Sequence, residues 1–240
     1  MLILGIESST LQSSVCLGTE RGPLAVASLS RGRAHAEFLA PAIRFCLDQA
    51  AVPMSSVAGV AVSLGPGLFT GMRVGIATAQ ALAHARRLPV VGLNALDLLA
   101  FPVRYLRADR VICAVIDARR SELFWAFYRP SQGGVQRVTD LRVGPAPKLA
   151  GEIEAVREDV LCVGEGALTV ASLLESAGAA VASVGNAHPT AWALVELALP
   201  RFLREETQHP DDLRPIYVRK ADARISWQNR GALFGGRPEP

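Results

Sequence analysis

The sequence predicts an α/β protein built from two similar lobes. Short apolar runs rich in valine and isoleucine alternate with amphipathic helical stretches. The same order of elements, βββαβα, occurs twice along the chain, and an internal repeat of this size implies two lobes with a cleft between them. Half of the 240 residues are hydrophobic, which is enough for a full core.

The first half begins with a short buried strand at 2–6. Turn residues separate it from two further strands, expected at 13–17 and 24–28. An amphipathic helix is predicted at 36–50, because its apolar residues recur at helical spacing. A strand at 59–63 and a helix at 71–86 then complete the first βββαβα unit.

The second half repeats this order. We expect strands at 111–116, 122–128 and about 139–143, a helix at 146–156, a strand at 160–163 and helices at 169–176 and 190–205. Thr190 is suited to cap the last helix. Glu7 and Asp117 end the first strand of each half, so the repeat extends to polar positions.

These elements divide the chain into an N-terminal lobe at 1–105, a C-terminal lobe at 106–218 and a tail at 219–240. The tail holds five basic and two acidic residues, so its net charge of +3 equals that of the whole chain. Glycine and proline favour a flexible tail. A basic tail can contact nucleic-acid phosphates, although a charge run is more often a solvated face.

Cysteine usage and the N-terminus favour a cytoplasmic protein without a membrane partner. The four cysteines are far apart in apolar surroundings and form no Cys-x-x-Cys pair, so we expect buried free thiols in a reducing compartment. The apolar N-terminal run meets Glu7 too early for a secretory signal. No run approaches the length of about 20 apolar residues that a membrane helix needs.

A glycine-dense turn, with Gly65, Gly67 and Gly71, joins the strand at 59–63 to the following helix. Glycine allows close approach of another backbone, which favours a tight strand-to-helix turn. A glycine turn that opens a helix can also hold an anion, or contact a partner. The spacing of a phosphate-binding loop is missing, since no Lys-Ser/Thr pair follows Gly71.

Small residues recur every four positions in the helix after this turn. A neighbouring helix could approach this row closely, either within the same lobe or from a partner protein. The partner interpretation adds the apolar residues of the helix at 36–50. The candidate interface comprises Phe38, Leu39, Ile43, Leu47, Gly71, Gly75, Ala79 and Ala83.

No catalytic or metal-binding residue is predicted. Nucleophile motifs are missing, and Ser8, Ser9 and Thr10 have no histidine near them in the sequence. The histidines form no i, i+4 pair, so we interpret them as surface or capping residues; they are His35, His84, His188 and His209. Glu7 and Asp117 fit either a general acid/base pair or, more commonly, carboxylates that accept turn N–H groups.

The order of elements resembles the actin, sugar-kinase and Hsp70 (ASKHA) fold. In that fold each lobe's first hairpin carries an Asp-x-Gly-type turn at which phosphate touches the backbone. Here the corresponding turns read Glu-Ser-Ser-Thr at 7–10 and Asp-Ala-Arg-Arg at 117–120, without glycine. Glu7, Thr10, Asp117 and Arg119 are therefore only weak cofactor-binding candidates, and the alternative of an autonomous ATP-dependent phosphotransferase is disfavoured.

Several segments carry a closer resemblance. They are Gly65 to Ala83, Pro89-Val-Val-Gly92, Ile116-Asp-Ala-Arg119, Pro215-Ile-Tyr-Val-Arg219 and His35-Ala-Glu37. Together they resemble the TsaB (YeaZ) family, bacterial accessory subunits in making threonylcarbamoyladenosine beside the tRNA anticodon. The resemblance spans roughly residues 2–219. Val218 stands where leucine is usual, and Glu7 where aspartate is usual.

The resemblance implies a non-catalytic subunit that binds and stabilises the catalytic subunit TsaD, with the ATPase TsaE as a third component and tRNA held through the complex. It also implies pairing through the candidate helices, nucleotide (ATP or ADP) at the interfaces of the complex, and a homodimer as an option for the chain alone. TsaD binds metal through a His-x-x-x-His pair, whose positions are filled here by Ala95, Leu96 and Leu98. A glycoprotease-like metallopeptidase, the weaker alternative, requires that pair.

Overall fold

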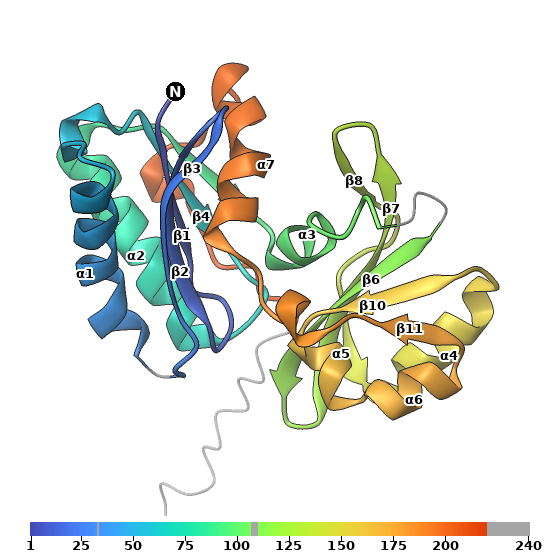
Figure 1. Ribbon diagram of the computed structural model, residues 1–240. Helices are drawn as coiled ribbons and strands as arrows, with labels where there is room; N and C mark the ends of the chain where they lie inside the picture. Colours follow the sequence, from blue (N-terminus) through green and yellow to red (C-terminus); the bar gives the residue numbers. More distant parts are fainter. Residues whose placement is uncertain (33, 107–109, 220–240) are drawn as a thin grey trace, which may run out of the picture.

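The structure, a computed structural model, describes residues 1–32, 34–106 and 110–219. Two lobes, each built on one β-sheet, lie side by side (Figure 1). The predicted two-lobe α/β architecture is therefore confirmed. The basic tail lies outside the described residues except for Arg219.

The sheet of the first lobe has the order β3-β2-β1-β4-β5. Its strands are β1 (Ile3–Glu7), β2 (Ser13–Thr19), β3 (Gly22–Leu29), β4 (Gly59–Ser63) and β5 (Val90–Leu93). The first three strands are antiparallel, whereas β4 and β5 continue the sheet in parallel with β1. Helices α1 (His35–Gln49) and α2 (Phe69–Arg86) cover one face, and α7 (Ala191–Leu203) covers the other (Figure 1).

Alternate residues of the strands in the first sheet supply the two cores. Leu4 points into the core shared with α1 and α2, while Ile3 points into the core shared with α7. This alternation is the period-two pattern of a strand that is covered on both faces. Both residues are fully buried.

The second sheet has the order β11-β10-β6-β7-β8, and β9 also pairs with β7. Its strands are β6 (Val111–Arg119), β7 (Glu122–Ser131), β8 (Gly134–Arg137), β9 (Arg142–Pro145), β10 (Val160–Val163) and β11 (Ala179–Val181). Helix α3 (Ala95–Ala100) packs on one face, and α4 (Ala146–Val156), α5 (Glu165–Thr169) and α6 (Ala171–Ser176) pack on the other. Short 3-10 turns are η1 (Met54–Ser56), η2 (Val184–Asn186) and η3 (Pro210–Asp212).

The predicted lobe boundaries need correction, because the chain crosses between the lobes. Helix α3 was assigned to the first lobe but packs against β6 and β7 of the second. Helix α7 was assigned to the second lobe, yet Leu194, Val195 and Phe202 pack on the first sheet. Leu213, further along, also joins the first lobe's core. Burial of apolar residues against the first sheet therefore decides where the end of the chain belongs.

Several predicted elements differ locally from the structure. The strand expected at 139–143 is wrong in its first half, since only 142–143 belong to a strand, β9. The helix expected at 169–176 begins two residues later, as α6, and a separate helix, α5, precedes it, because Val170 adopts φ −127° and ψ 25° between them. The predicted cap of the last helix is confirmed: Thr190 Oγ1 accepts a hydrogen bond from the Ala193 N–H at 3.2 Å.

The four cysteines are free and buried, as predicted. Among the described residues, we find no helix that combines the length and the apolar character needed to cross a bilayer.

Candidate functional site at the junction of the lobes

The glycine turn fits tightly against the hairpin that follows β1. The Leu68 N–H donates to the Ser9 carbonyl at 2.7 Å, and Ser8 Oγ donates to the Gly71 carbonyl at 2.9 Å. A Cβ atom on Gly67 would lie 2.0 Å from the Ser9 carbonyl oxygen, and one on Gly71 would lie 2.2 Å from that of Ser8. These glycines serve close backbone packing, so the tight-turn interpretation describes this segment best.

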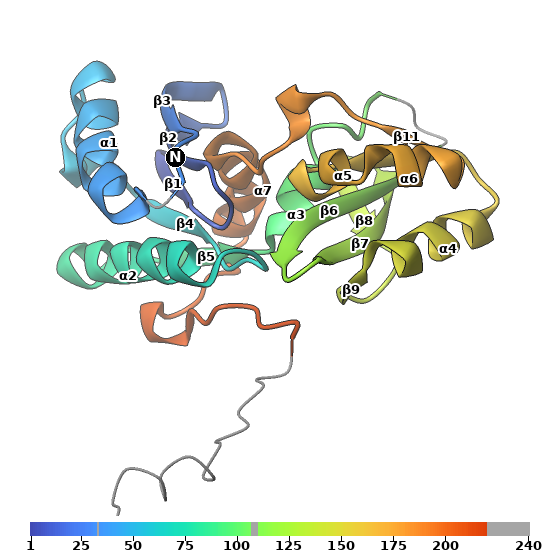
Figure 2. The ribbon, with the colours of Figure 1, turned by 90° about the horizontal axis from the view of Figure 1, so that it is seen from below.

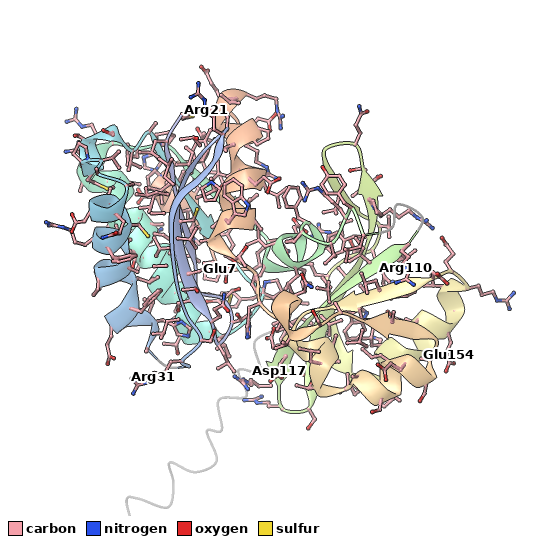
Figure 3. All side chains as sticks on the ribbon, viewed as in Figure 1. Glu7, Arg21, Arg31, Arg110, Asp117 and Glu154 are labelled. Atoms are coloured by element: carbon pink, nitrogen blue, oxygen red, sulfur yellow. The ribbon has the colours of Figure 1, made fainter. Side chains whose placement is uncertain are left out.

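Glu7 ends β1 and is fully buried (Figure 3). Its Oε1 accepts hydrogen bonds from the N–H and the hydroxyl of Ser9, both at 2.6 Å. Its Oε2 has no hydrogen-bond partner among the described residues. Burial raises the pKa of this carboxyl, against the smaller lowering by the hydrogen bonds from Ser9. A carboxyl that is enclosed in the protein core is poorly placed to hold a metal or a phosphate-bound cation.

Asp117 lies near the end of β6, the first strand of the second lobe (Figure 3). Its Oδ1 accepts the Arg119 N–H at 2.7 Å, and its Oδ2 lies 3.0 Å from Arg119 Nη1. The guanidinium of Arg119 therefore occupies one side of the turn at which a phosphate-binding protein of this fold leaves room. Of the weak cofactor candidates, the structure brings Asp117 and Arg119 into direct contact, whereas Glu7 lies apart in the core of the first lobe.

A threonine, a histidine and a glutamate connect the two lobes. Thr10 Oγ1 lies 3.1 Å from His188 Nδ1, and the same nitrogen lies 3.8 Å from Glu165 Oε2. No sequence pattern pairs Thr10 with a histidine 178 positions away. Both contacts use Nδ1, whereas a catalytic relay needs one partner on each ring nitrogen. The group therefore bridges the lobes without forming such a relay.

Glu165 titrates close to neutrality at this bridge. Burial raises its pKa to about 7; hydrogen bonds from the backbone lower it, and the nearby carboxylate of Asp117 raises it. Its Oε2 has no hydrogen-bond partner among the described residues. Burial also lowers the pKa of His188, which favours the neutral imidazole.

A second histidine contact lies beneath the glycine turn. Ser13 Oγ is 2.5 Å from His35 Nδ1, and both side chains are buried. His35 is therefore an interior histidine and not the surface or capping residue that was predicted. His209 does cap a turn, since its Nδ1 accepts the Asp211 N–H at 3.3 Å. His84 is exposed and contacts Asp211.

The predicted row of small residues on α2 points into the first lobe and not toward the surface. Ala79 and Ala83 are buried in the core of the first lobe, and a Cβ atom on Gly75 would lie 2.3 Å from Ser8 Oγ. Gly71 is likewise packed on Ser8. The sheet needs a row of small residues here because β1 and its hairpin approach α2 closely. In the structure these four residues pack within their own lobe, which is the alternative that the sequence analysis left open.

The four candidates on α1 divide in the same manner. Leu39 and Ile43 are buried in the first lobe's core. Phe38 and Leu47 are partly buried and pack against that core.

The outward surfaces of α1 and α2 carry a different row of small residues. On α2, Ala77, Ala81 and Ala85 are exposed and spaced by four; on α1, Ala36 and Ala40 are exposed with the same spacing. Ala36 and Val74 both line a hollow of about 920 Å³ between the helix starts, so these parts of the two helices face each other. The sequence did contain this signal, but the first row matched the same spacing and contained glycines.

Metal ligands do not gather anywhere among the described residues: no group of three histidine, cysteine, aspartate or glutamate side chains is placed to share an ion. In the segment where the catalytic relative has its histidines, Ala95, Leu96 and Leu98 are fully buried in α3.

Sequence and structure comparisons show which known proteins this chain resembles. The family model for TsaD, tRNA N6-adenosine threonylcarbamoyltransferase, matches residues 29–227. The Escherichia coli protein TsaB, a tRNA threonylcarbamoyladenosine biosynthesis protein, is 26% identical over 229 residues, which cover 95% of this chain and 97% of that protein.

Two solved structures from Pseudomonas aeruginosa extend the comparison. One is YeaZ, 30% identical with a TM-score of 0.79 over 90% of this chain and 99% of that one. The other, described as similar to peptidase YeaZ, is 31% identical with a TM-score of 0.79 over 91% and 99%. The likeness to these structures, together with the two sheets of this chain, confirms the predicted ASKHA-type fold.

Proposed function

The chain belongs to the TsaD family of tRNA N6-adenosine threonylcarbamoyltransferases and, within it, to the TsaB (YeaZ) group, and we propose that it serves as a non-catalytic subunit in making threonylcarbamoyladenosine in tRNA. Its role is to bind and stabilise a TsaD-type catalytic subunit. The observation that carries this proposal is the similarity to TsaB over nearly the full length of both chains.

The contacts at the junction of the lobes support a non-catalytic role. The two hairpin turns are closed by their own hydrogen bonds, and the Arg119 guanidinium lies against one of them. Thr10, His188 and Glu165 meet through a single nitrogen. These groups hold the lobes together, which suits a protein that presents a surface to a partner. Nucleotide, where the complex uses it, is then held at the interfaces with a TsaE-type ATPase.

The outer face of α1 and α2 is the surface that we propose for the TsaD-type partner. It is made of exposed alanines and of Val74, with a hollow at one end. Small side chains allow two helices to approach to about 8 Å between axes. The same face is available for a second copy of this chain, so a homodimer would compete with the partner, and tRNA would reach the chain through the complex.

Co-purification with a tagged TsaD-type protein tests this surface. Ala81→Arg should abolish the complex while the chain keeps its melting temperature, because an arginine in a close helix contact buries an unpaired charge at a cost of about 3 kcal/mol. Threonylcarbamoyladenosine in a reconstituted mixture should fall with it.

Ala155→Arg is the matched control, because Ala155 is an exposed alanine on α4 of the other lobe. It should leave the complex intact. If Ala81→Arg retains the partner as well as Ala155→Arg does, the partner binds elsewhere and the proposed surface is wrong.

A further inference from the structure

A second pocket lies on the side of the junction that the end of the chain crosses. After η3 the chain runs beside α2 toward the second lobe (Figure 2), and the Ile216 N–H donates to the Leu64 carbonyl at 2.8 Å. The pocket beneath this segment has a volume of about 260 Å³. Its walls come from the glycine turn, the hairpin between β6 and β7, and residues 216–219. The residues that bridge the lobes, Thr10, His188 and Glu165, do not line this pocket.

Two aromatic side chains stand at this pocket with much of their surface exposed. Phe69 at the start of α2 is 53% exposed and Tyr217 is 54% exposed. Their ring centroids are 6.0 Å apart, with 32° between the ring planes. Large aromatic side chains are usually buried, since each hides 150–250 Å² when covered. This pair instead offers apolar faces at the edge of a cavity, which suits stacking with a planar ligand.

One guanidinium group lies on the Phe69 ring beside the pocket, and two others line the pocket itself. The Arg73 guanidinium carbon lies 3.9 Å from the centroid of the Phe69 ring, and among the described residues no carboxylate pairs with this arginine. Arg119, held by Asp117, lines the pocket, and so does Arg219, which pairs with Glu122. Asp117 pairs with Arg119 and Glu122 pairs with Arg219. Among the described residues, this leaves Arg73, which is stacked on the exposed Phe69 ring, without a carboxylate partner.

We propose that this pocket binds an unpaired nucleotide, with its base against Phe69 and Tyr217 and its phosphate on Arg73 and Arg119. Aromatic rings beside arginines bind single-stranded nucleic acid because every base has a stacking face and every phosphate a charge. This proposal rests on the proposed function in one respect, that RNA supplies the nucleotide. A free mononucleotide shares the chemistry, and the experiment separates the two sources.

The test uses the full chain and a fluorescein-labelled single-stranded RNA of about ten nucleotides, with binding followed by fluorescence anisotropy. Tyr217→Ala should raise the Kd about fivefold or more, because one stacking surface is lost. Tyr217→Phe should stay within about twofold of the unchanged chain, because the ring remains. Arg73→Gln should raise the Kd and flatten its dependence on salt, because one phosphate contact is lost.

Two matched variants control for nonspecific effects. Tyr105→Ala removes an aromatic side chain that is 74% exposed elsewhere, and Arg86→Gln removes an exposed cation from the far end of α2. Neither should change the Kd by more than about twofold. The pocket is ruled out if the unchanged chain does not bind the RNA, or if Tyr217→Ala and Arg73→Gln behave as the controls do.

Competition with AMP identifies the source of the nucleotide. Displacement of the RNA only at millimolar AMP supports an RNA strand, which makes several contacts, whereas displacement at micromolar AMP supports a free nucleotide in the same pocket. Co-purification of Tyr217→Ala with the TsaD-type protein is measured in parallel. A variant that loses RNA but keeps the partner separates this site from the helix surface, and failure of RNA binding alone leaves the proposed subunit role standing.

Discussion

Glu7 and Asp117 accept the same hydrogen bond in the two lobes, from the backbone N–H two residues further along. The distances are 2.6 Å to the Ser9 nitrogen and 2.7 Å to the Arg119 nitrogen. The duplicated hairpin is therefore preserved in its backbone, while the surroundings of the two acids differ: Glu7 is fully buried, and Asp117 holds an arginine. The backbone hydrogen bond of the turn is therefore repeated, whereas the environment of the acid is not.

Titration with Mg-ATP should show weak binding at most. The two turns lack glycine, and Arg119 occupies the side of the second one. We expect isothermal calorimetry to give no Kd tighter than about 100 μM, which corresponds to about −5.5 kcal/mol. Micromolar binding that is lost in Asp117→Ala would instead favour an autonomous phosphotransferase.

The stability of the chain should fall as the pH rises from about 4.5 to about 7, through Glu165. Its folded pKa is raised from 4.5 to about 7, so between these values the folded state holds a proton that the unfolded state releases. The stabilisation is complete below the unfolded pKa and lost as the pH passes the folded one. It amounts to about 3 kcal/mol at most.

Glu165→Gln removes this titration and serves as the comparison. Chemical unfolding at about pH 5 and pH 8 should show a smaller loss of stability for the variant than for the unchanged chain. Equal losses in both proteins would mean that Glu165 does not titrate in this range.

Gly71→Ala should destabilise the chain by about 2 kcal/mol or more, since the new methyl group would lie 2.2 Å from the Ser8 carbonyl oxygen. Gly151→Ala is the opposite case: this glycine is exposed within α4, and a Cβ atom there would meet nothing within 4 Å. It should stabilise by about 0.5–1 kcal/mol. Thermal unfolding of the two variants checks both signs.

Ala79→Arg should unfold the chain, whereas Ala81→Arg, two positions further along, should leave it folded. Ala79 is fully buried in the first lobe's core and Ala81 is exposed. An arginine forced into that core overpacks it and buries a charge, at a cost of about 3 kcal/mol or more. Circular dichroism melting curves compare the pair, and equal melting temperatures would contradict the assigned faces of α2.

Local sequence patterns were sufficient for most of the fold. Apolar runs such as the one that forms β4, and the capping residue Thr190, carry their signal within a few positions. Residues 139–143 lacked such a signal because β8 and β9 are only four residues each. Helix α7 was identified correctly as a helix, but its place on the first sheet depends on contacts far away in the sequence.

The candidate site was harder to predict, for the same reason. Spacing by four marks two rows on α2, one through Ala79 and one through Ala81, and only the position of the sheet tells which is covered. The bridge between Thr10 and His188 joins residues 178 positions apart and follows from the packing of whole lobes. The stacking of Phe69 and Tyr217 likewise needs the course of the last described segment.

The return of α7 to the first sheet also sets an order of events during synthesis. A nascent chain that has reached residue 190 contains all five strands of the first sheet but not the helix that covers one face of it. Until that helix leaves the ribosome, Ile3, Cys16 and Ala61 have no apolar partner from α7. The lobe that is made first therefore finishes folding last. A stalled or truncated product would expose the apolar face of the first sheet to chaperones and proteases.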